Sequence, residues 1–345
     1  MTGLHLSTTA AGAYNCRAAA LPWPLRSGGT GVRRFIVLMT LVSVGALSAA
    51  VAAYQQPANP PDKRVVEVEK LRDNLFVLRG GGGNTAVFVT TDGVVVVDTK
   101  NPGWGQPILD KIKELTNKPV TTIINTHTHG DHVSGNVEFP PTVDVVTHEN
   151  TAANMKAMRT VTGFKPQPNS GNIFETSKGV GLPKRTFKDR MTIGKGNDQV
   201  DLYYFGRGHT DGDAWIVFPA ARVMHAGDIF SGKNLPLLDA NNGGSGLEIG
   251  GTLAKAHAGV KDVESIITGH STVMTMADLK EYADFNTEFA QFVQAAKKKG
   301  QSPSQIADSW KMADKYKGYA PIVDKEGKPI PRILTNVEVI FDEIK

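Results

Sequence analysis

The residues of this chain best suited to chemistry form one short run, HTHGDH, which begins at His127. Imidazole and carboxylate groups are ligands that zinc and similar metal ions prefer. His127 and His129 are two residues apart in an extended segment, so their side chains project to the same side. A tight turn at Gly130 can bring Asp131 and His132 to a second point nearby. The run therefore offers ligands for two metal ions, and the alternative interpretation is a histidine-rich surface loop.

Three more candidate ligands occur singly, each after an apolar run and next to a glycine. They are His209 after Gly208, Asp228 after Gly227 and His270 after Gly269. A glycine lets the backbone turn sharply at the edge of a sheet and leaves room for a metal ion beside it. One histidine at a strand end is usually a hydrogen-bonded residue, but three such ends together with the run favour a metal site.

The series His-x-His-x-Asp-His, Gly-His-Thr, Gly-Asp and Gly-His resembles the metallo-β-lactamase superfamily, and the resemblance covers residues 65–285. It implies an α/β (α+β) fold, a four-layer αββα sandwich with metal ions in a groove at one edge of its two sheets. The implied ligands are His127, His129 and His209 for the first metal ion, Asp131, His132 and His270 for the second, and Asp228 as a bridge between them.

The acid at position 228 indicates which branch of this superfamily the chain resembles. Lactamases with a cysteine ligand are excluded, because the single cysteine, Cys16, lies far upstream. Lactamases with histidine ligands in both sites lack a bridging acid, so Asp228 makes the chain resemble glyoxalase II and the broader hydrolase branch. Flavodiiron proteins carry an acid where His129 stands, which argues against an oxygen-reducing di-iron site.

These motifs predict an exported hydrolase with two zinc ions, which uses a hydroxide shared by the metals to attack an ester, thioester, lactone or amide. Asp131 is expected to be a ligand first and a proton-transferring residue second. Iron or manganese are alternatives to zinc. Two other activities stay open: β-lactam hydrolysis, and the oxygen chemistry of a mononuclear iron enzyme of the sulfur-dioxygenase kind.

The charge of the chain is concentrated at its N-terminus. Residues 1–53 contain four arginines and no acidic residue. Without them, the 38 basic residues become 34, equal to the 34 acidic residues, so the remainder is formally neutral. A neutral body argues against nucleic acid as a partner and leaves a small-molecule substrate as the expected one.

The pattern of residues 1–53 predicts a leader peptide. Arg33 and Arg34, the apolar residues 35–47 and the small residues 48–53 match the three regions of a signal peptide. This predicts a periplasmic or secreted protein, with membrane contact only if the leader stays as an uncleaved anchor. Residues 1–31 suit an exported protein poorly and are interpreted as a misassigned start of translation. The remaining length of about 290 residues can bury a core without a disulfide.

After a proline-rich linker at 54–63, the sequence predicts a metallo-β-lactamase-like domain at 64–285 and a C-terminal helical extension at 286–345. Alternating and apolar runs predict strands at 65–69, 75–78, 86–89, 94–97, 120–124, 143–146, 186–193, 199–205, 214–218 and 222–225. Helical spacing appears at 107–115, 150–158, 276–299 and 302–315. The loops 160–185 and 233–246 are either lids beside the metal site or solvated connections.

The other polar residues near these motifs have more ordinary expected roles. Asp98 ends a strand and is expected to accept a hydrogen bond from a metal-bound histidine. His225 is expected to pack in the core, and His148 to be a surface or capping residue. Turn formation is the default explanation for Asp213.

Overall fold

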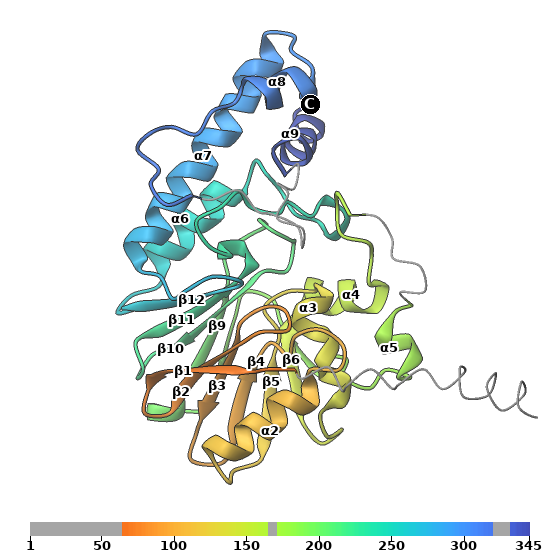
Figure 1. Ribbon diagram of the computed structural model, residues 1–345, viewed down its shortest axis with the longest axis vertical. Coiled ribbons are helices and arrows are strands. Elements are labelled where there is room, and N and C mark those ends of the chain that lie inside the picture. Colours follow the sequence, from red (N-terminus) through yellow and green to blue (C-terminus); the bar gives the residue numbers. More distant parts are fainter. Residues whose placement is uncertain (1–63, 165–170, 320–331) are drawn as a thin grey trace, which may run out of the picture. The chain divides into compact units, whose positions relative to one another are not determined.

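A computed structural model describes residues 64–164, 171–319 and 332–345 (Figure 1). Residues 64–345 form one compact unit. The predicted leader and linker lie outside the described residues. In the described part of the chain, every helix is too short or too polar to cross a membrane.

Seven strands form the first sheet, in the order of the sequence. They are β1 (Glu67–Arg72), β2 (Leu75–Arg79), β3 (Thr85–Val89), β4 (Val94–Val97), β5 (Val120–Ile124), β6 (Asp144–His148) and β7 (Arg185–Phe187). Strands β1 to β4 pair antiparallel, and β4 to β7 pair parallel. Parallel pairing needs crossover connections, which the helices after β4, β5 and β6 provide.

Five strands form the second sheet, in the order β12-β11-β10-β9-β8. They are β8 (Arg190–Ile193), β9 (Val200–Tyr204), β10 (Ala214–Phe218), β11 (Val223–Gly227) and β12 (Ser265–Thr268). The single strand predicted at 186–193 is wrong. Its first part, β7, pairs with β6, and its second part, β8, pairs with β9 in the other sheet. A β pattern by itself does not reveal where a chain crosses from one sheet to another.

The described residues also contain eight α-helices. They are α2 (Gly105–Leu115), α3 (Gly130–Val133), α4 (Glu149–Ala157), α5 (Ile173–Thr176), α6 (Ile249–Gly259), α7 (Met276–Lys298), α8 (Pro303–Ser309) and α9 (Arg332–Glu343). A capping box between Thr275 and Asp278 fixes the start of α7. The predicted helix at 302–315 ends early, at Ser309, and the predicted domain boundary at 285 falls inside α7.

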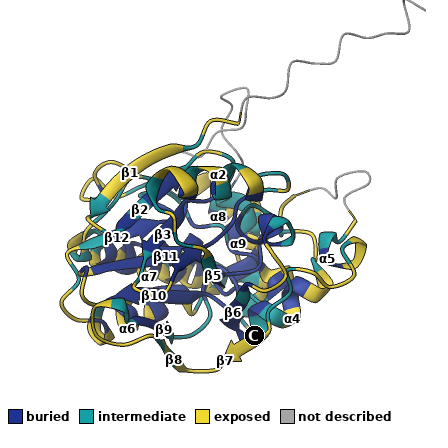
Figure 2. Cartoon of the chain, turned by 90° about the horizontal axis from the view of Figure 1, so that it is seen from below, coloured by how far each residue is buried: buried dark blue, intermediate teal, exposed yellow. Residues whose placement is uncertain are grey.

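The layers follow from the alternation of side chains along the strands. In β4, Val95 and Val97 face the second sheet, whereas Val94 and Val96 pack with α2. In β10, Ile216 joins the core between the sheets, and its neighbours Trp215 and Val217 pack on the side of α6 and α7. Buried strands therefore lie between helical outer layers (Figure 2). The predicted αββα sandwich is confirmed.

Four loops leave the two sheets at the same edge. The run that begins at His127 follows β5, and His209, Asp228 and His270 follow β9, β11 and β12. Both sheets thus deliver their candidate ligands to one end of the sandwich, below the C-terminal helices in Figure 1.

Candidate metal centre

The structure brings all seven predicted ligands together, in two groups. Side-chain donor atoms of His127, His129, His209 and Asp228 lie within 4.8 Å of one another, and so do those of Asp131, His132 and His270. The division into two groups is the one that the resemblance implied. Each group could hold a metal ion.

The predicted turn at Gly130 is a short helix. His129 is the N-cap residue of α3, and the backbone N–H of His132 donates to its carbonyl at 2.9 Å. The rings of His127 and His129 lie edge to face, with centroids 4.8 Å apart. The turn carries His132 to the other side of His127, where their ring centroids are 4.2 Å apart. The local chain thus splits one run of ligands between two points.

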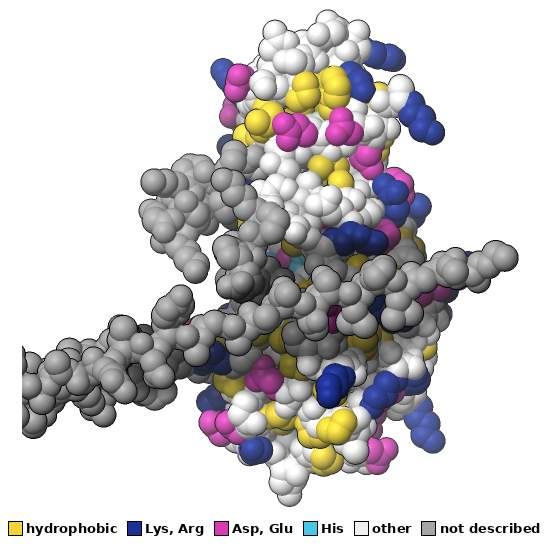
Figure 3. Space-filling view, turned by 90° about the vertical axis from the view of Figure 1, so that its right-hand side faces the viewer, with side chains coloured by type: hydrophobic (Ala, Val, Ile, Leu, Met, Phe, Trp, Pro, Cys, Tyr) yellow, Lys and Arg dark blue, Asp and Glu magenta, His cyan; other side chains and the backbone are white. Residues whose placement is uncertain are grey.

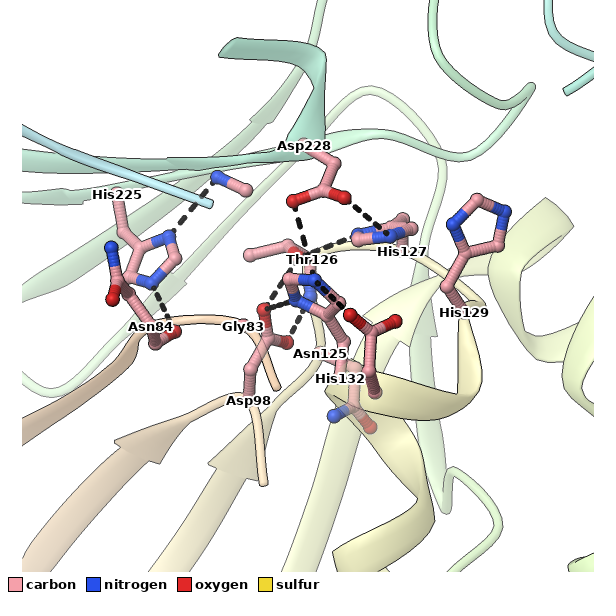
Figure 4. Close-up of polar contacts among 12 residues, drawn as sticks. Gly83, Asn84, Asp98, Asn125, Thr126, His127, His129, His132, His225 and Asp228 are labelled. Carbon is pink, nitrogen blue, oxygen red and sulfur yellow. Dashed lines mark hydrogen bonds and ion pairs between the residues drawn. The ribbon is translucent and has the colours of Figure 1, made fainter. Parts of the chain in front are cut away.

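Asp228 lies between the two groups. Its Oδ2 is 3.9 Å from Nε2 of both His127 and His209, and 3.1 Å from Nε2 of His270. Its Oδ1 is 3.2 Å from Nε2 of His132. One carboxylate therefore faces histidines of both groups, as a bridging ligand must (Figure 4).

Glycine leaves room for that carboxylate. Gly227, which has a φ of 56°, makes the turn from β11 into Asp228. A Cβ atom on Gly269 would lie 1.8 Å from Asp228 Oδ1. The glycine of the predicted strand, glycine and ligand pattern is therefore required at position 269, because a side chain there would collide with Asp228.

The donor set fits metal ions. His127 Nε2 and Asp228 Oδ1 are buried without a hydrogen bond from any described residue, and an unpaired buried polar atom is costly. Burial and the neighbouring imidazoles lower the pKa of His127, and burial lowers the pKa of His209 to about 4. Both rings are therefore neutral at pH 7, with lone pairs available to a metal ion.

The second group holds protons in the absence of metal. The charge of Asp228 raises the pKa of His270 to about 9. Burial opposes protonation of His132, but Asp228, Asp131 and Asp98 outweigh it and raise its pKa. Burial likewise opposes ionisation of Asp131, but His132 and His270 keep the pKa of this carboxyl low. A metal ion would replace these imidazole protons as the counter-charge of the two carboxylates.

Five of the candidate ligands are histidines. Four of them form a hydrogen bond through the ring nitrogen that faces away from the site. His132 Nδ1 lies 2.7 Å from Asp98 Oδ2, so the predicted hydrogen bond to Asp98 is present. His127 Nδ1 lies 3.0 Å from Thr126 Oγ1, which donates to Asp98 at 2.7 Å. His209 Nδ1 donates to the Leu237 carbonyl at 2.7 Å, and His129 Nε2 lies 2.7 Å from Asp239 Oδ2. Such contacts orient metal-binding imidazoles.

Sequence reasoning missed three residues that support the site. A Cβ atom on Gly83 would lie 2.1 Å from the His132 ring, so the last glycine of the run at 80–83 packs directly against it. The buried Lys100 donates to the carbonyls of Leu78 and Gly83 at 2.8 and 2.7 Å, and burial lowers its pKa to about 7. The glycine run was a visible signal. Nothing in the local sequence marked Lys100 or Asp239.

The other residues considered from the sequence lie outside the ligand set. His225 is buried and bonds the Asn84 carbonyl at 3.0 Å, so its predicted packing role is confirmed. His148 accepts from the Asn150 N–H at the start of α4, but it is buried rather than on the surface, stacked on Tyr204. Asp213 accepts from the N–H and hydroxyl of Thr210, as expected for a turn.

The second group is the more accessible one. Two of its three side chains are partly exposed, His270 at 38% and Asp131 at 32%, and only His132 is buried, whereas all four residues of the first group are buried. Figure 3 shows histidine surface in a hollow between the C-terminal helices and the sandwich. Arg332, at the start of α9, is near enough to Asp228 for an electrostatic interaction, and burial lowers its pKa. The start of α9 therefore lies near the site.

Comparison with known proteins agrees with this geometry. A family model described as the metallo-beta-lactamase superfamily matches residues 78–273. A metallo-beta-lactamase type 2 of Elizabethkingia meningoseptica is 28% identical over 176 residues, which are 48% of this chain and 62% of that protein. A hydroxyacylglutathione hydrolase of Nostoc punctiforme is 26% identical over 177 residues, 50% of this chain and 54% of that protein. The chain thus covers less than two thirds of each of these relatives.

Solved structures share the fold. A metallo-beta-lactamase from Pontibacter korlensis superposes with a TM-score of 0.52 at 19% identity, over 64% of this chain and 99% of that one. A sec-alkyl sulfatase superposes with a TM-score of 0.57 at 13% identity, over 81% of this chain and 50% of that one. At these identities the similarity concerns the fold alone.

Proposed function

The chain belongs to the metallo-β-lactamase superfamily, and on that premise we propose that it is an exported hydrolase with a dinuclear zinc centre. Its substrate would be a small molecule with an ester, thioester, lactone or amide bond. The ligands would be the seven residues of the two groups, with Asp228 bridging.

The position of Asp228 is the observation that carries the proposal. Its two oxygens face four histidines, drawn from both groups, at 3.1 to 3.9 Å. A carboxylate surrounded in this way suits a pair of metal ions better than a single one. The histidines facing it belong to both sheets, so an intact sandwich is needed to assemble the pair.

Two bound metal ions would polarise the substrate's carbonyl group and lower the pKa of a water molecule, making it a nucleophile at neutral pH. The protein residues have separate tasks. The buried histidines orient the centre, because their outer nitrogens are fixed by Thr126, Asp98, Asp239 and the Leu237 carbonyl. Asp131 would first be a ligand of the second group; its side chain is partly exposed, so the carboxylate could also exchange a proton with the reacting groups.

β-Lactam hydrolysis is the second candidate function. The similarity to the metallo-beta-lactamase of Elizabethkingia meningoseptica favours it. The bridging position of Asp228 favours the first candidate instead. Hydroxyacylglutathione hydrolase, the name of another relative, describes hydrolysis of a thioester.

Metal analysis and a substrate screen test the proposal together. Protein expressed from residue 54 and purified without chelator should contain about two zinc ions per chain. It should hydrolyse at least one member of a panel of esters, thioesters, lactones, anilides and a chromogenic cephalosporin. Replacement of both His127 and His129 by alanine should abolish that activity. One iron per chain, or activity that survives the double replacement, would overturn the proposal.

A further inference from the structure

Asp239 is a fully buried carboxylate beside the first ligand group. It belongs to the loop that follows Asp228, and it is 0% exposed. Its Oδ2 lies 2.7 Å from His129 Nε2 and accepts from Asn242 Nδ2 at 2.7 Å. Its Oδ1 accepts from the N–H and the hydroxyl of Thr162, both at 3.0 Å.

The groups around this carboxylate are hydrogen-bond donors, and each of them needs an acceptor. The one exception is the hydroxyl of Thr162, which can donate or accept. The Thr162 N–H and the Asn242 amide donate, and His129 must donate from Nε2 if its Nδ1 is to face the metal site. His129 Nδ1 does face the site, 3.1 Å from His209 Nε2. An uncharged amide at position 239 would turn its own N–H₂ group toward one of these donors. The environment therefore requires an ionised acid.

The backbone on either side of Asp239 holds a second ligand. The N–H of Asp239 donates to the His209 carbonyl at 3.0 Å, and the Leu237 carbonyl accepts from His209 Nδ1 at 2.7 Å. Residues 237–239 thus contact two of the three histidines of the first group. A displacement of this segment would move both rings.

The same carboxylate bonds a segment that is distant in the sequence. Thr162 is anchored by Asp239 and also accepts from the N–H of Asn241 at 2.9 Å. Asn241 Nδ2 donates to the Thr160 carbonyl at 2.8 Å. Residues 160–162 are therefore tied to the loop that carries Asp239, and through Asp239 to His129.

We propose that Asp239 is a positioning residue that fixes His129 for metal binding and couples occupancy of the first metal position to the order of residues 160–162. The inference rests on the metal binding of the proposed function. A metal ion on Nδ1 makes the opposite N–H of His129 a stronger donor, so it strengthens the bond to Asp239. Coupling between binding events is reciprocal, so loosening residues 160–162 should in turn weaken metal binding.

Zinc affinity, measured by competition with a chromophoric chelator, is the first readout. Asp239→Asn should weaken the first zinc-binding step by about 10- to 100-fold. Thr162→Val removes one hydroxyl donor and the acceptor for Asn241, and should weaken the same step by about 2- to 10-fold. Asp211→Asn is the matched control, because the Asp211 carboxylate accepts from Asn154 and does not bond a histidine ring. Its zinc affinity should equal that of the unaltered protein.

Hydrogen exchange is the second readout, and its first comparison, with and without zinc, uses only the unaltered protein. Zinc should slow amide exchange in a peptide covering residues 158–164, and Asp239→Asn should remove most of that protection. Equal zinc affinity in Asp239→Asn and the unaltered protein, or exchange at 158–164 that zinc does not change, would overturn the inference. The proposed function fails separately, if the unaltered protein binds zinc and shows these effects but hydrolyses none of the substrates.

Discussion

Asp98 offers the sharpest test of how the centre is oriented. This residue is 0% exposed and accepts three hydrogen bonds: from His132 Nδ1 at 2.7 Å, and from the N–H and hydroxyl of Thr126 at 2.8 and 2.7 Å. Its φ is 62°, in the left-handed region that asparagine tolerates well. Asp98→Asn therefore changes charge and acceptor number while keeping shape and backbone.

The loss can be estimated from these contacts. One oxygen of the asparagine can still accept from the Thr126 N–H, and the Thr126 hydroxyl can rotate to accept from the new amide. His132 has no such freedom, because moving its proton from Nδ1 to Nε2 would block the nitrogen that faces the site. A hydrogen bond to a charged group contributes about 1.5–3 kcal/mol. We therefore expect zinc binding in the second group to weaken by about 10- to 100-fold.

Chelator competition on the purified variant measures this change directly. Asp213→Asn is the control, since Asp213 is also buried and also accepts from a threonine N–H and hydroxyl, but bonds no candidate ligand. Burial raises the pKa of Asp213 to about 8, so the control removes little charge at pH 7. Unchanged zinc affinity in Asp98→Asn, or an equal loss in Asp213→Asn, would refute the assigned role of Asp98.

Three further predictions concern the second group and the order of metal binding. Gly83→Ala should displace the His132 ring and weaken zinc binding, because the added Cβ would lie 2.1 Å from it; Gly251→Ala, where nothing lies within 4 Å, should leave zinc binding unchanged and serves as the control. The stabilising contribution of His270 to the metal-free protein should fall as pH rises from about 6.5 to 9, because the folded-state pKa of His270 is raised to about 9 by Asp228, and this contribution is present below the unfolded value of 6.5 and lost above 9. Lys100, with its pKa lowered to about 7, changes stability in the opposite direction above pH 7, so the contribution of His270 is measured as the difference between the melting curves of the unaltered protein and His270→Gln, both metal-free. A difference that does not shrink between pH 6.5 and 9 would contradict the prediction. Zinc should bind in two steps in a calorimetric titration. The tighter step should be at the first group, because all three of its histidines form a hydrogen bond through the outer ring nitrogen. A single step with two equal sites would contradict this ranking.

Local sequence was enough to predict the candidate ligands that the fold brings together and most of the strands. Strands β4 and β10 are visible as continuous apolar runs of four and five residues, because a strand buried on both faces needs apolar side chains throughout. The run beginning at His127 and the three glycine-flanked ligands are equally local, since metal preference depends on side-chain type and a sharp turn depends on glycine. The bond from His132 to Asp98 could also be expected, because Asp98 ends the strand beside the one that leads into the run.

The tertiary structure alone decided which residues support the ligands. Asp239 bonds His129 across 110 residues of sequence, and its own neighbours contain no periodic or motif signal. Lys100 reads as an ordinary surface lysine, yet the fold buries it against the Gly83 carbonyl. The strand predicted at 186–193 divides between two sheets, because its partners β6 and β9 come from different layers. Sequence patterns record which face a residue buries, whereas the partner it meets there depends on how distant segments pack.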